Sequence, residues 1–408
     1  MDIKSKIKEK DITNLAQELI RIPSDEIAGE QEVCEYLSDI LKSLGMKVRL
    51  QEVLPKRPNI IAEVLGGNNG KSIMFNGHID TVPIGNIEKS IMFNGHIDTV
   101  PIGNIEKWNT DPYKAIIKDS KLFGRGATDM KGSIASMIIA IKYIMNNVEN
   151  FNGKIIFTGV MAEETTGLGT QKVLEENIKT DMAIVGEPSD EKIYRAHKGT
   201  IWFNIFTYGK LEHSSESDTE SNNAIINMMR LIEEINKISK ELEGKNNSLV
   251  GHPSINVGLI EGGTKQNMIA DSCKVSIDRR TLPEEEPNEI LDELRVRFDN
   301  LRLIDNRLKF NIEKDTIREA VEVSESEPIV QEVKRAVNKI LNINPIVSGM
   351  KATTDMSILV NQGNIPSVIY GPGFIKQAHT IDEFIEVERL VESSQVYAEV
   401  LLNILTNN

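Results

Sequence analysis

Apolar residues along the first part of the chain follow two different spacings. The segment Ile12–Ile20 carries its apolar residues on one helical face, and a second helical stripe, Val33–Leu44, ends at Gly45. Short apolar runs such as Asn59–Leu65 and Lys154–Val160 predict strands between helices. Strands that alternate with amphipathic helices predict an α/β domain in which helices cover both faces of a mixed sheet.

The pattern changes near residue 195. From there to about residue 314, strands such as Ile201–Thr207 and helices such as Ala224–Ile238 have the order of a compact α+β unit. Afterwards the first pattern resumes. We therefore predict an α/β domain built from residues 1–194 and 315–408, interrupted by a smaller inserted α+β domain at residues 195–314.

A tandem repeat interrupts the first domain. Residues 71–88 (KSIMFNGHIDTVPIGNIE) recur letter for letter as residues 89–106, so the chain carries two His-x-Asp pairs, His78/Asp80 and His96/Asp98. A spare copy placed before the strand only lengthens a turn, at roughly 0.6 kcal/mol per doubling of loop length. A spare copy placed after it would intrude on the strand end, where a displacement of about 1 Å can cost a hundredfold in rate. We favour His96/Asp98 as the working pair, with His78/Asp80 as the alternative.

Composition narrows the class of protein. The 408 residues include 47 basic and 61 acidic ones, and the net charge of -14 argues against nucleic acid or an anionic membrane as the main partner. The N-terminus lacks an apolar leader, and no run approaches the roughly 20 apolar residues of a membrane span. Cys34 and Cys273 do not have the spacing of a thiolate metal site, so we expect the reducing cytoplasm.

Polar residues gather where predicted strands end or glycine-rich loops begin. These candidates are His96/Asp98, Asp129, Glu163-Glu164, Glu187 and His379. Carboxyl ends of strands meet at one edge of an α/β sheet, where so many carboxylates would repel one another unless cations neutralised them. Nitrogen and oxygen ligands without thiolates fit two Zn²⁺ ions, or Co²⁺ or Mn²⁺ in their place.

The number of candidate ligands fits a two-metal site. Asp129 would bridge the two ions, one of which would take His96 and either Glu187 or Glu164. The other ion would take His379 and the remaining glutamate.

Two carboxylates remain for other roles. Asp98 could accept the N–H of His96 and fix its tautomer. Glu163 could act as general base toward the metal-bound water, which predicts hydrolysis of an amide or ester by metal-bound hydroxide.

At this point the chain resembles a known family, the metallopeptidase/deacylase group containing acetylornithine deacetylase, succinyl-diaminopimelate desuccinylase, aminoacylase and carboxypeptidase G. The shared motifs follow one another in the order NGHIDTVP, GRGATDMKG, MAEETTG, VGEPS, AHKGT, HSS, QNMIADSC, SIDRR and GPGFIKQAHTIDE. The resemblance implies a catalytic α/β domain with an inserted lid and dimerisation domain. It implies as metal ligands His96, Asp129, Glu164, Glu187 and His379, with Glu163 as general base and Asp98 orienting His96.

The resemblance also implies roles for three residues of the inserted domain. His213 would reach the active site of the partner subunit in a homodimer and stabilise the tetrahedral oxyanion. Asn267 and Arg280 would hold the substrate, Arg280 through its bidentate fork.

Three functions follow as hypotheses. The leading one is a metal-dependent deacylase that cleaves the amide of an N-acyl amino acid with a free carboxylate. The second is an exopeptidase of the dipeptidase or carboxypeptidase type. The third is a catalytically dead dimeric scaffold, spoiled by the duplication at residues 71–106.

Overall fold

The computed structural model describes residues 2–66, 90–149, 151–176, 178, 180–216 and 222–406. The chain divides into two compact units. The larger contains residues 1–195, 323–347 and 354–408, and the smaller contains residues 196–322 and 348–353. Among the described residues, no helix is both long and apolar enough to cross a membrane.

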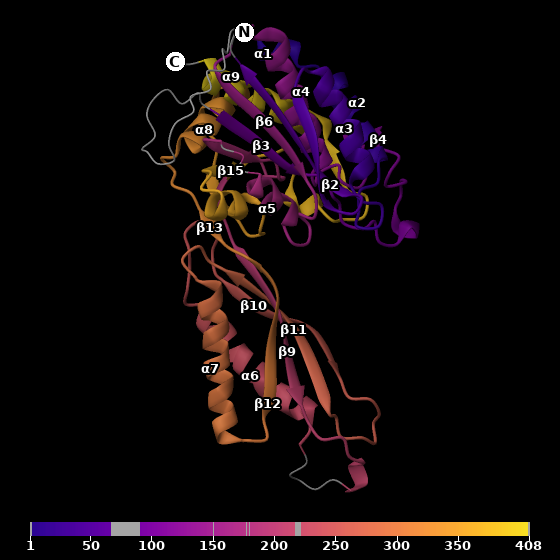
Figure 1. The fold of residues 1–408 in the computed structure, drawn as a ribbon, viewed down its shortest axis with the longest axis vertical. Coiled ribbons are helices and arrows are strands. Elements are labelled where there is room, and N and C mark those ends of the chain that lie inside the picture. Colours follow the sequence, from indigo (N-terminus) through magenta and orange to yellow (C-terminus); the bar gives the residue numbers. More distant parts are fainter. Residues whose placement is uncertain are drawn as a thin grey trace, which may run out of the picture. The chain divides into compact units, whose positions relative to one another are not determined.

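A mixed sheet forms the centre of the larger unit (Figure 1). Its strands, in spatial order, are β1 (Lys47–Leu54), β2 (Arg57–Gly66), β6 (Gly153–Val160), β3 (Ser90–His96), β7 (Met182–Val185), β15 (Ser367–Ile369) and β8 (Ile193–His197). Strand β3 runs parallel to both neighbours, β6 and β7, whereas β1, β2 and β6 pair in antiparallel fashion. The predicted mixed α/β fold is confirmed.

Helices pack along this sheet. They are α1 (Ile3–Lys6), α2 (Glu9–Arg21), α3 (Gln31–Ser43), α4 (Lys131–Asn147), α5 (Leu168–Glu175), α8 (Pro328–Leu341) and α9 (Val387–Thr406). Helix α4 packs against β3, α2 and α9, and this explains why its first eleven residues are all buried rather than only one face. Short helical turns lie at Ile105–Lys107, Ser214–Glu216, Ile358–Gln362 and Ile375–Gln377.

A small second sheet joins segments that are distant in sequence. It consists of β16 (Phe384–Glu386), β5 (Lys121–Phe123) and β4 (Ile116–Lys118), in that order, with Phe384 opposite Phe123. Their pairing brings the glycine-rich loop that follows β5 next to the loop that precedes β16.

Strands β2 and β3 flank β6. Gly66, at the end of β2, pairs with Gly153 of β6, and Ser90, at the start of β3, pairs with Lys154 on the other side of β6. The upstream repeat, with His78 and Asp80, lies outside the described residues. The downstream repeat supplies β3.

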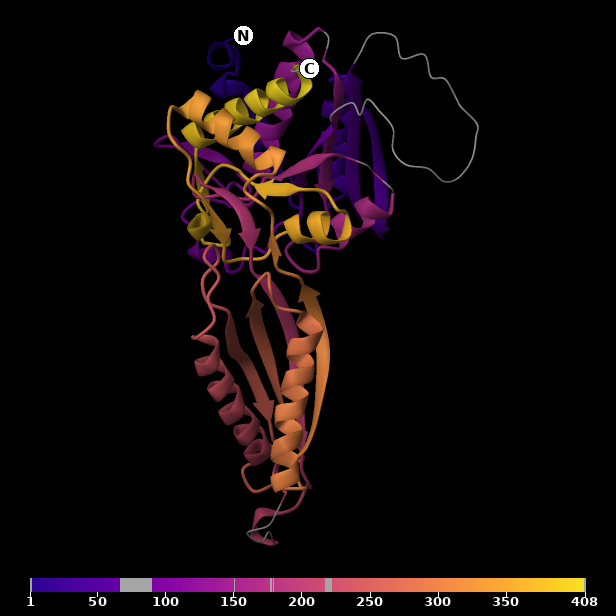
Figure 2. The same ribbon diagram turned by 90° about the vertical axis from the view of Figure 1, so that its left-hand side faces the viewer.

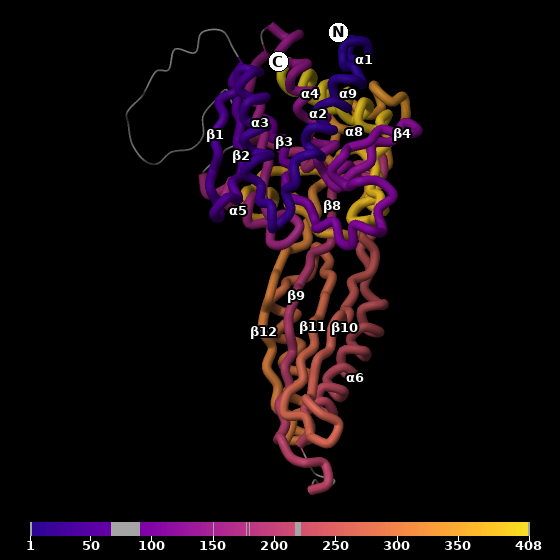
Figure 3. The backbone as a smooth tube through the Cα atoms, turned by 90° about the vertical axis from the view of Figure 1, so that its right-hand side faces the viewer, coloured from indigo at the N-terminus to yellow at the C-terminus, as the bar shows by residue number. Residues whose placement is uncertain are grey.

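The smaller unit is an α+β structure. Its sheet has the order β10 (Ser254–Gly262), β11 (Ser272–Thr281), β9 (Gly199–Tyr208) and β12 (Lys309–Arg318), and all neighbouring strands are antiparallel. Helices α6 (Ala224–Leu242) and α7 (Pro287–Ile304) lie on one face (Figure 2), and the opposite view has the strands in front (Figure 3). Two short strands, β13 (Val321–Glu322) and β14 (Val347–Met350), belong instead to the large sheet, where both pair with β8.

The core of this smaller unit lies between the two helices and the sheet. It includes Phe203 of β9, Leu231 of α6 and Phe298 of α7. Strand β12 continues past residue 314, where the sequence suggested a domain boundary, because its register with β9 extends to Arg318 opposite Thr200.

Candidate metal centre

Three neighbouring strands end at the same edge of the large sheet. His96 is the last residue of β3, Glu163 and Glu164 follow β6, and Glu187 follows β7. Because β3 is parallel to both β6 and β7, their carboxyl ends meet. Asp129 comes from the loop before α4.

Asp129 lies between two imidazoles. Its Oδ1 is 2.8 Å from Nε2 of His96, and its Oδ2 is 3.2 Å from Nε2 of His379. His96 ends strand β3, whereas His379 lies far along the sequence in the loop before β16. A carboxylate whose two oxygens face different ligand groups has the arrangement of a bridging ligand.

Each histidine also faces one glutamate. Nε2 of His96 is 3.7 Å from Glu187 Oε1, and Nε2 of His379 is 3.0 Å from Glu164 Oε2. Of the two pairings that the sequence left open, the geometry brings together His96 with Glu187 and His379 with Glu164. The imidazole of His96 is buried, whereas the side chain of His379 is 51% exposed.

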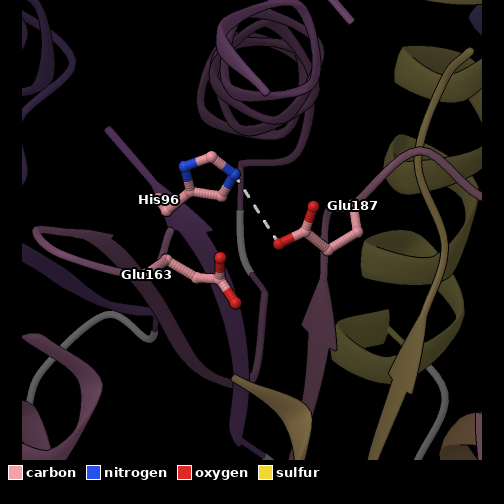
Figure 4. Close-up of side chains that lie close together, drawn as sticks. All are labelled: His96, Glu163 and Glu187. Atoms are coloured by element: carbon pink, nitrogen blue, oxygen red, sulfur yellow. Dashed lines mark ion pairs between the residues drawn. The ribbon is translucent and has the colours of Figure 1, made fainter. Parts of the chain in front are cut away.

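Glu163 points into the same space from the loop after β6. Figure 4 shows its carboxylate and that of Glu187 beside the imidazole of His96. Ligand atoms of these three residues lie within 4.8 Å of one another, as do those of His96, Asp129 and Glu164. The described residues thus contain two overlapping groups that share His96.

Asp98 has a wider role in the geometry than the sequence indicated. Its Oδ1 lies 3.5 Å from His96 Nδ1, and its backbone carbonyl oxygen lies closer, at 3.0 Å. The carboxylate accepts hydrogen bonds from the backbone N–H groups of Glu163 and Glu164, at 3.1 and 3.2 Å. Asp98 therefore fixes the loop that carries both glutamates, in addition to lying beside His96.

The titrating groups of the cluster are strongly perturbed. Burial, together with the charge on Asp129, raises the pKa of Glu164 to about 7, and burial raises that of Glu187 well above its usual range. Hydrogen bonds to Asp129 and Glu164 raise the pKa of His379 to about 10. Burial opposes protonation of His96, but the charge on Glu187 and the hydrogen bond to Asp129 outweigh it and raise its pKa.

These shifts describe a buried site that has more negative groups than positive ones. Burial and the closeness of several carboxylates favour the protonated forms of both the imidazoles and the carboxyls. Divalent cations would do so with the nitrogen and oxygen donors present, and they would favour the deprotonated form of every ligand. The residues therefore fit a pair of metal ions of the Zn²⁺, Co²⁺ or Mn²⁺ type.

The three predicted lid residues lie at two ends of one sheet. His213 Nε2 is 3.2 Å from the side-chain nitrogen of Asn267, close to the start of β11. Arg280 is next to the last residue of β11 and donates hydrogen bonds to Thr200 and Asp278. The smaller unit brings His213 and Asn267 together and keeps Arg280 apart from them.

Sequence reasoning missed two buried charged residues near the cluster and one in the smaller unit. Arg125 and Glu383 form an ion pair beside Asp129, and Lys198 is buried in the smaller unit. All three stand inside motifs that were recognised, GRGATDMKG, HTIDE and AHKGT. Their position within these motifs was the signal that could have identified them.

The chain is similar in sequence to several known proteins. The chain is 26% identical to a probable succinyl-diaminopimelate desuccinylase of Staphylococcus epidermidis, over 97% of this chain and 98% of that protein. It is 26% identical to an N-formyl-4-amino-5-aminomethyl-2-methylpyrimidine deformylase of Bacillus subtilis, over 98% and 96%. It is 29% identical to an acetylornithine deacetylase of Aliivibrio salmonicida, over 88% and 87%.

Solved structures share the fold. An aminopeptidase of Bacillus cereus superposes with a TM-score of 0.77 at 20% identity, over 98% of this chain and 99% of that one. A dinuclear metal-binding peptidase of Bacillus subtilis has a TM-score of 0.70 at 17% identity, over 97% and 98%. The family model described as "Peptidase family M20/M25/M40" matches residues 92–403. The resemblance noted from the motifs is therefore confirmed. This chain is a hydrolase that belongs to peptidase family M20/M25/M40.

Proposed function

We propose that the protein is a dinuclear metal-dependent deacylase that cleaves the amide bond of N-acyl amino acids with a free carboxylate. The observation that carries this proposal is Asp129, whose two carboxylate oxygens face His96 and His379 separately. One metal ion would be held by His96, Glu187 and Asp129, and the other by His379, Glu164 and Asp129. Zn²⁺ is the proposed resident ion, with Co²⁺ or Mn²⁺ as replacements.

The protein's own groups do most of the positioning and proton transfer. Two bound cations would supply Lewis acidity, which polarises the scissile carbonyl and makes an attacking water more acidic. Glu163 takes the proton of that water and delivers it to the leaving nitrogen, a general-base role that fits its position beside His96 and Glu187. Asp98 holds Glu163 in place through the backbone N–H group of that residue.

A cluster of cations in the smaller unit supports a carboxylate-bearing substrate. Burial lowers the pKa of Lys198, and the positive charges of Lys351, Arg280 and Arg279 lower it further. An anionic group would relieve this repulsion. Arg280, with its planar fork, would pair with the substrate carboxylate.

A homodimer is part of the proposal. Strand β11, Ser272–Thr281, is about 30 Å long at ~3.3 Å per residue, so His213 and Asn267 at one end cannot reach a substrate held by Arg280 at the other. In a dimer, His213 and Asn267 of one subunit would act on substrate bound by its partner. The edge strand β10 exposes Leu259 and Ile260 at 64% and 57%, which supports a contact with a second copy.

The test uses protein stripped of metal with a chelator and then reloaded with Zn²⁺ or Co²⁺. We expect release of free amine from N-acetyl-ornithine or N-succinyl-diaminopimelate only after reloading. Cleavage of dipeptides without cleavage of N-acyl substrates would favour the exopeptidase alternative. Absence of both activities in metal-loaded protein would favour the scaffold, although the ligand set assembled around His96 despite the duplication argues against that reading. Sedimentation of the same sample tests the dimer.

A further inference from the structure

A buried ion pair lies next to the loop that carries Asp129. Arg125 Nη1 donates to Glu383 Oε2 at 2.6 Å, and the two residues are 3% and 0% exposed. Neither residue is among the proposed ligands or the general base. A charged pair so fully removed from water is costly unless further hydrogen bonds satisfy both partners.

The second oxygen of Glu383 holds the backbone of the bridging aspartate. Glu383 Oε1 accepts from the backbone N–H groups of Thr128, at 2.8 Å, and of Asp129, at 3.1 Å. The backbone carbonyl of Glu383 accepts from the N–H of Gly124 at 2.9 Å, at the other end of the same loop. One glutamate therefore fixes the loop from which Asp129 projects.

Arg125 connects this loop to the other two loops that carry histidine ligands. Its Nη1 donates to the carbonyl oxygen of Thr380, the residue after His379, at 3.3 Å. Its Nη2 donates to the carbonyl oxygen of Pro101, in the segment that continues from His96 and Asp98, at 3.4 Å. The ion pair thus contacts the backbone of three separate loops around one site.

A bridging carboxylate is more sensitive to its backbone position than a terminal ligand, because a shift that improves one metal bond worsens the other. We propose that Glu383 is a positioning residue that holds Asp129 where its two oxygens can serve both metal ions. This inference rests on the proposed dinuclear function and names what fixes the spacing of the two ions. Loss of the residue should weaken both metal-binding steps together, whereas loss of a terminal ligand should weaken one.

The test compares Glu383→Ala and Glu383→Gln with the unmutated protein in Co²⁺ titrations of metal-free protein, followed by the visible absorption of bound Co²⁺. We expect Glu383→Ala to weaken both binding steps by roughly 10- to 100-fold and to alter the absorption spectrum. Glu383→Gln keeps one oxygen acceptor but loses the charge opposite Arg125, so we expect a smaller loss in the same direction. Glu187→Gln, which removes a terminal ligand, should weaken mainly one step.

Glu386→Gln is the matched control. Glu386 is the last residue of strand β16, three residues after Glu383; its side chain is 40% exposed and contacts only Arg389 among the ion pairs of the described residues. It should titrate like the unmutated protein. Circular dichroism in the metal-free state establishes whether each variant is folded. If Glu383→Ala does not fold, the Co²⁺ titration of Glu383→Gln tests the proposal.

Two results separate this inference from the proposed function. A folded Glu383 variant with unchanged Co²⁺ affinity in both steps and an unchanged spectrum would overturn the positioning role, whatever the activity. Unmutated protein that binds two Co²⁺ ions but hydrolyses no N-acyl amino acid would overturn the deacylase proposal alone, since the titration needs no substrate.

Discussion

At the residue scale, the adjacent glutamates Glu163 and Glu164 face different partners. Glu164 contacts His379, whereas Glu163 lies in the group with His96 and Glu187. Asp98 accepts a hydrogen bond from the backbone N–H of each glutamate, and these two bonds hold the backbone of both residues in this orientation. Two residues of the same chemistry can therefore carry different roles.

This difference predicts different consequences for two identical substitutions. Glu163→Gln should lower kcat by about 10²- to 10⁴-fold, the usual contribution of a general base, while two metal ions remain bound. Glu164→Gln should lower metal content first, because it removes a proposed ligand. Metal analysis and initial rates on an N-acyl amino acid measure both effects. A Glu163→Gln variant that loses metal and a Glu164→Gln variant that keeps it would reverse the two assignments.

The sequence predicted which residues gather at the sheet edge, but not how they pair. His96, Glu163, Glu164 and Glu187 follow apolar strands, and that position can be read directly from the pattern. The pairing of each glutamate with one histidine depends on loop conformation, which leaves no periodic signal. Arg125 and Glu383 were missed because charged residues are usually exposed, and only their contact across the chain buries them.

At the scale of elements, the turn between β11 and α7 depends on a buried ion pair. Arg279 donates to Glu285 Oε1 at 2.8 Å, and the two side chains are largely buried. The other oxygen of Glu285 accepts from the backbone N–H of Leu282 at 3.0 Å. The pair therefore ties the end of a strand to the residues just before a helix.

Replacing Glu285 should destabilise the protein in a pH-dependent way. Burial opposes ionisation of Glu285, but hydrogen bonding to Lys245 and the charge of Arg279 outweigh it and lower its pKa. Its stabilising contribution is thus fully present above the unfolded pKa of about 4.3 and is lost as the pH falls through the lower folded pKa. Glu285→Gln should lower the free energy of unfolding at pH 7 by about 3 kcal/mol, since it leaves Arg279 buried without its partner.

Chemical denaturation at pH 7 and pH 3.5 measures this effect. The adjacent Glu284→Gln serves as control because Glu284 is exposed. A difference between Glu285→Gln and unmutated protein that does not shrink at the lower pH would contradict the assignment.

Long periodic elements were predictable, and short ones were not. Helices such as α2 and α6 have the one-sided apolar pattern that the sequence analysis used. The strands β4, β5 and β16 have three residues each, too few for any period to be visible, and β16 joins the hairpin of β4 and β5 only through a contact between residues distant in sequence. That small sheet is nevertheless what brings the loops of Asp129 and His379 together.

At the scale of the whole molecule, the duplicated segment allows a matched comparison. His78 and His96 stand in identical sequences, but His96 is at the end of β3 within the ligand cluster. His96→Ala should abolish metal binding at one site and reduce activity to background, whereas His78→Ala should resemble the unmutated protein. Metal content and hydrolysis rate provide the measurements. Loss in His78→Ala alone would mean that the upstream copy forms the site.

Deletion of residues 71–88 should leave the site intact. Gly66 and Ser90 lie on strands that flank β6, two strand spacings or about 10 Å apart. Residues 67–70 and Lys89 would remain to make this connection, and they can span up to about 20 Å. We expect unchanged metal affinity and a gain of roughly 1 kcal/mol in the free energy of unfolding, from the lower closure entropy of a shorter loop. A deletion variant that binds no metal would show that the extra residues are needed.

The identity of the two repeats before and within β3 has one more consequence, which concerns how the chain can change in length. Because the two repeats are identical, excising residues 71–88 and excising residues 89–106 give the same polypeptide. The sequence therefore does not record which repeat was added, and the loss of either one would give the same chain with a single copy. The segment between β2 and β3 can therefore gain or lose one repeat, and the chain keeps a histidine ligand in either case.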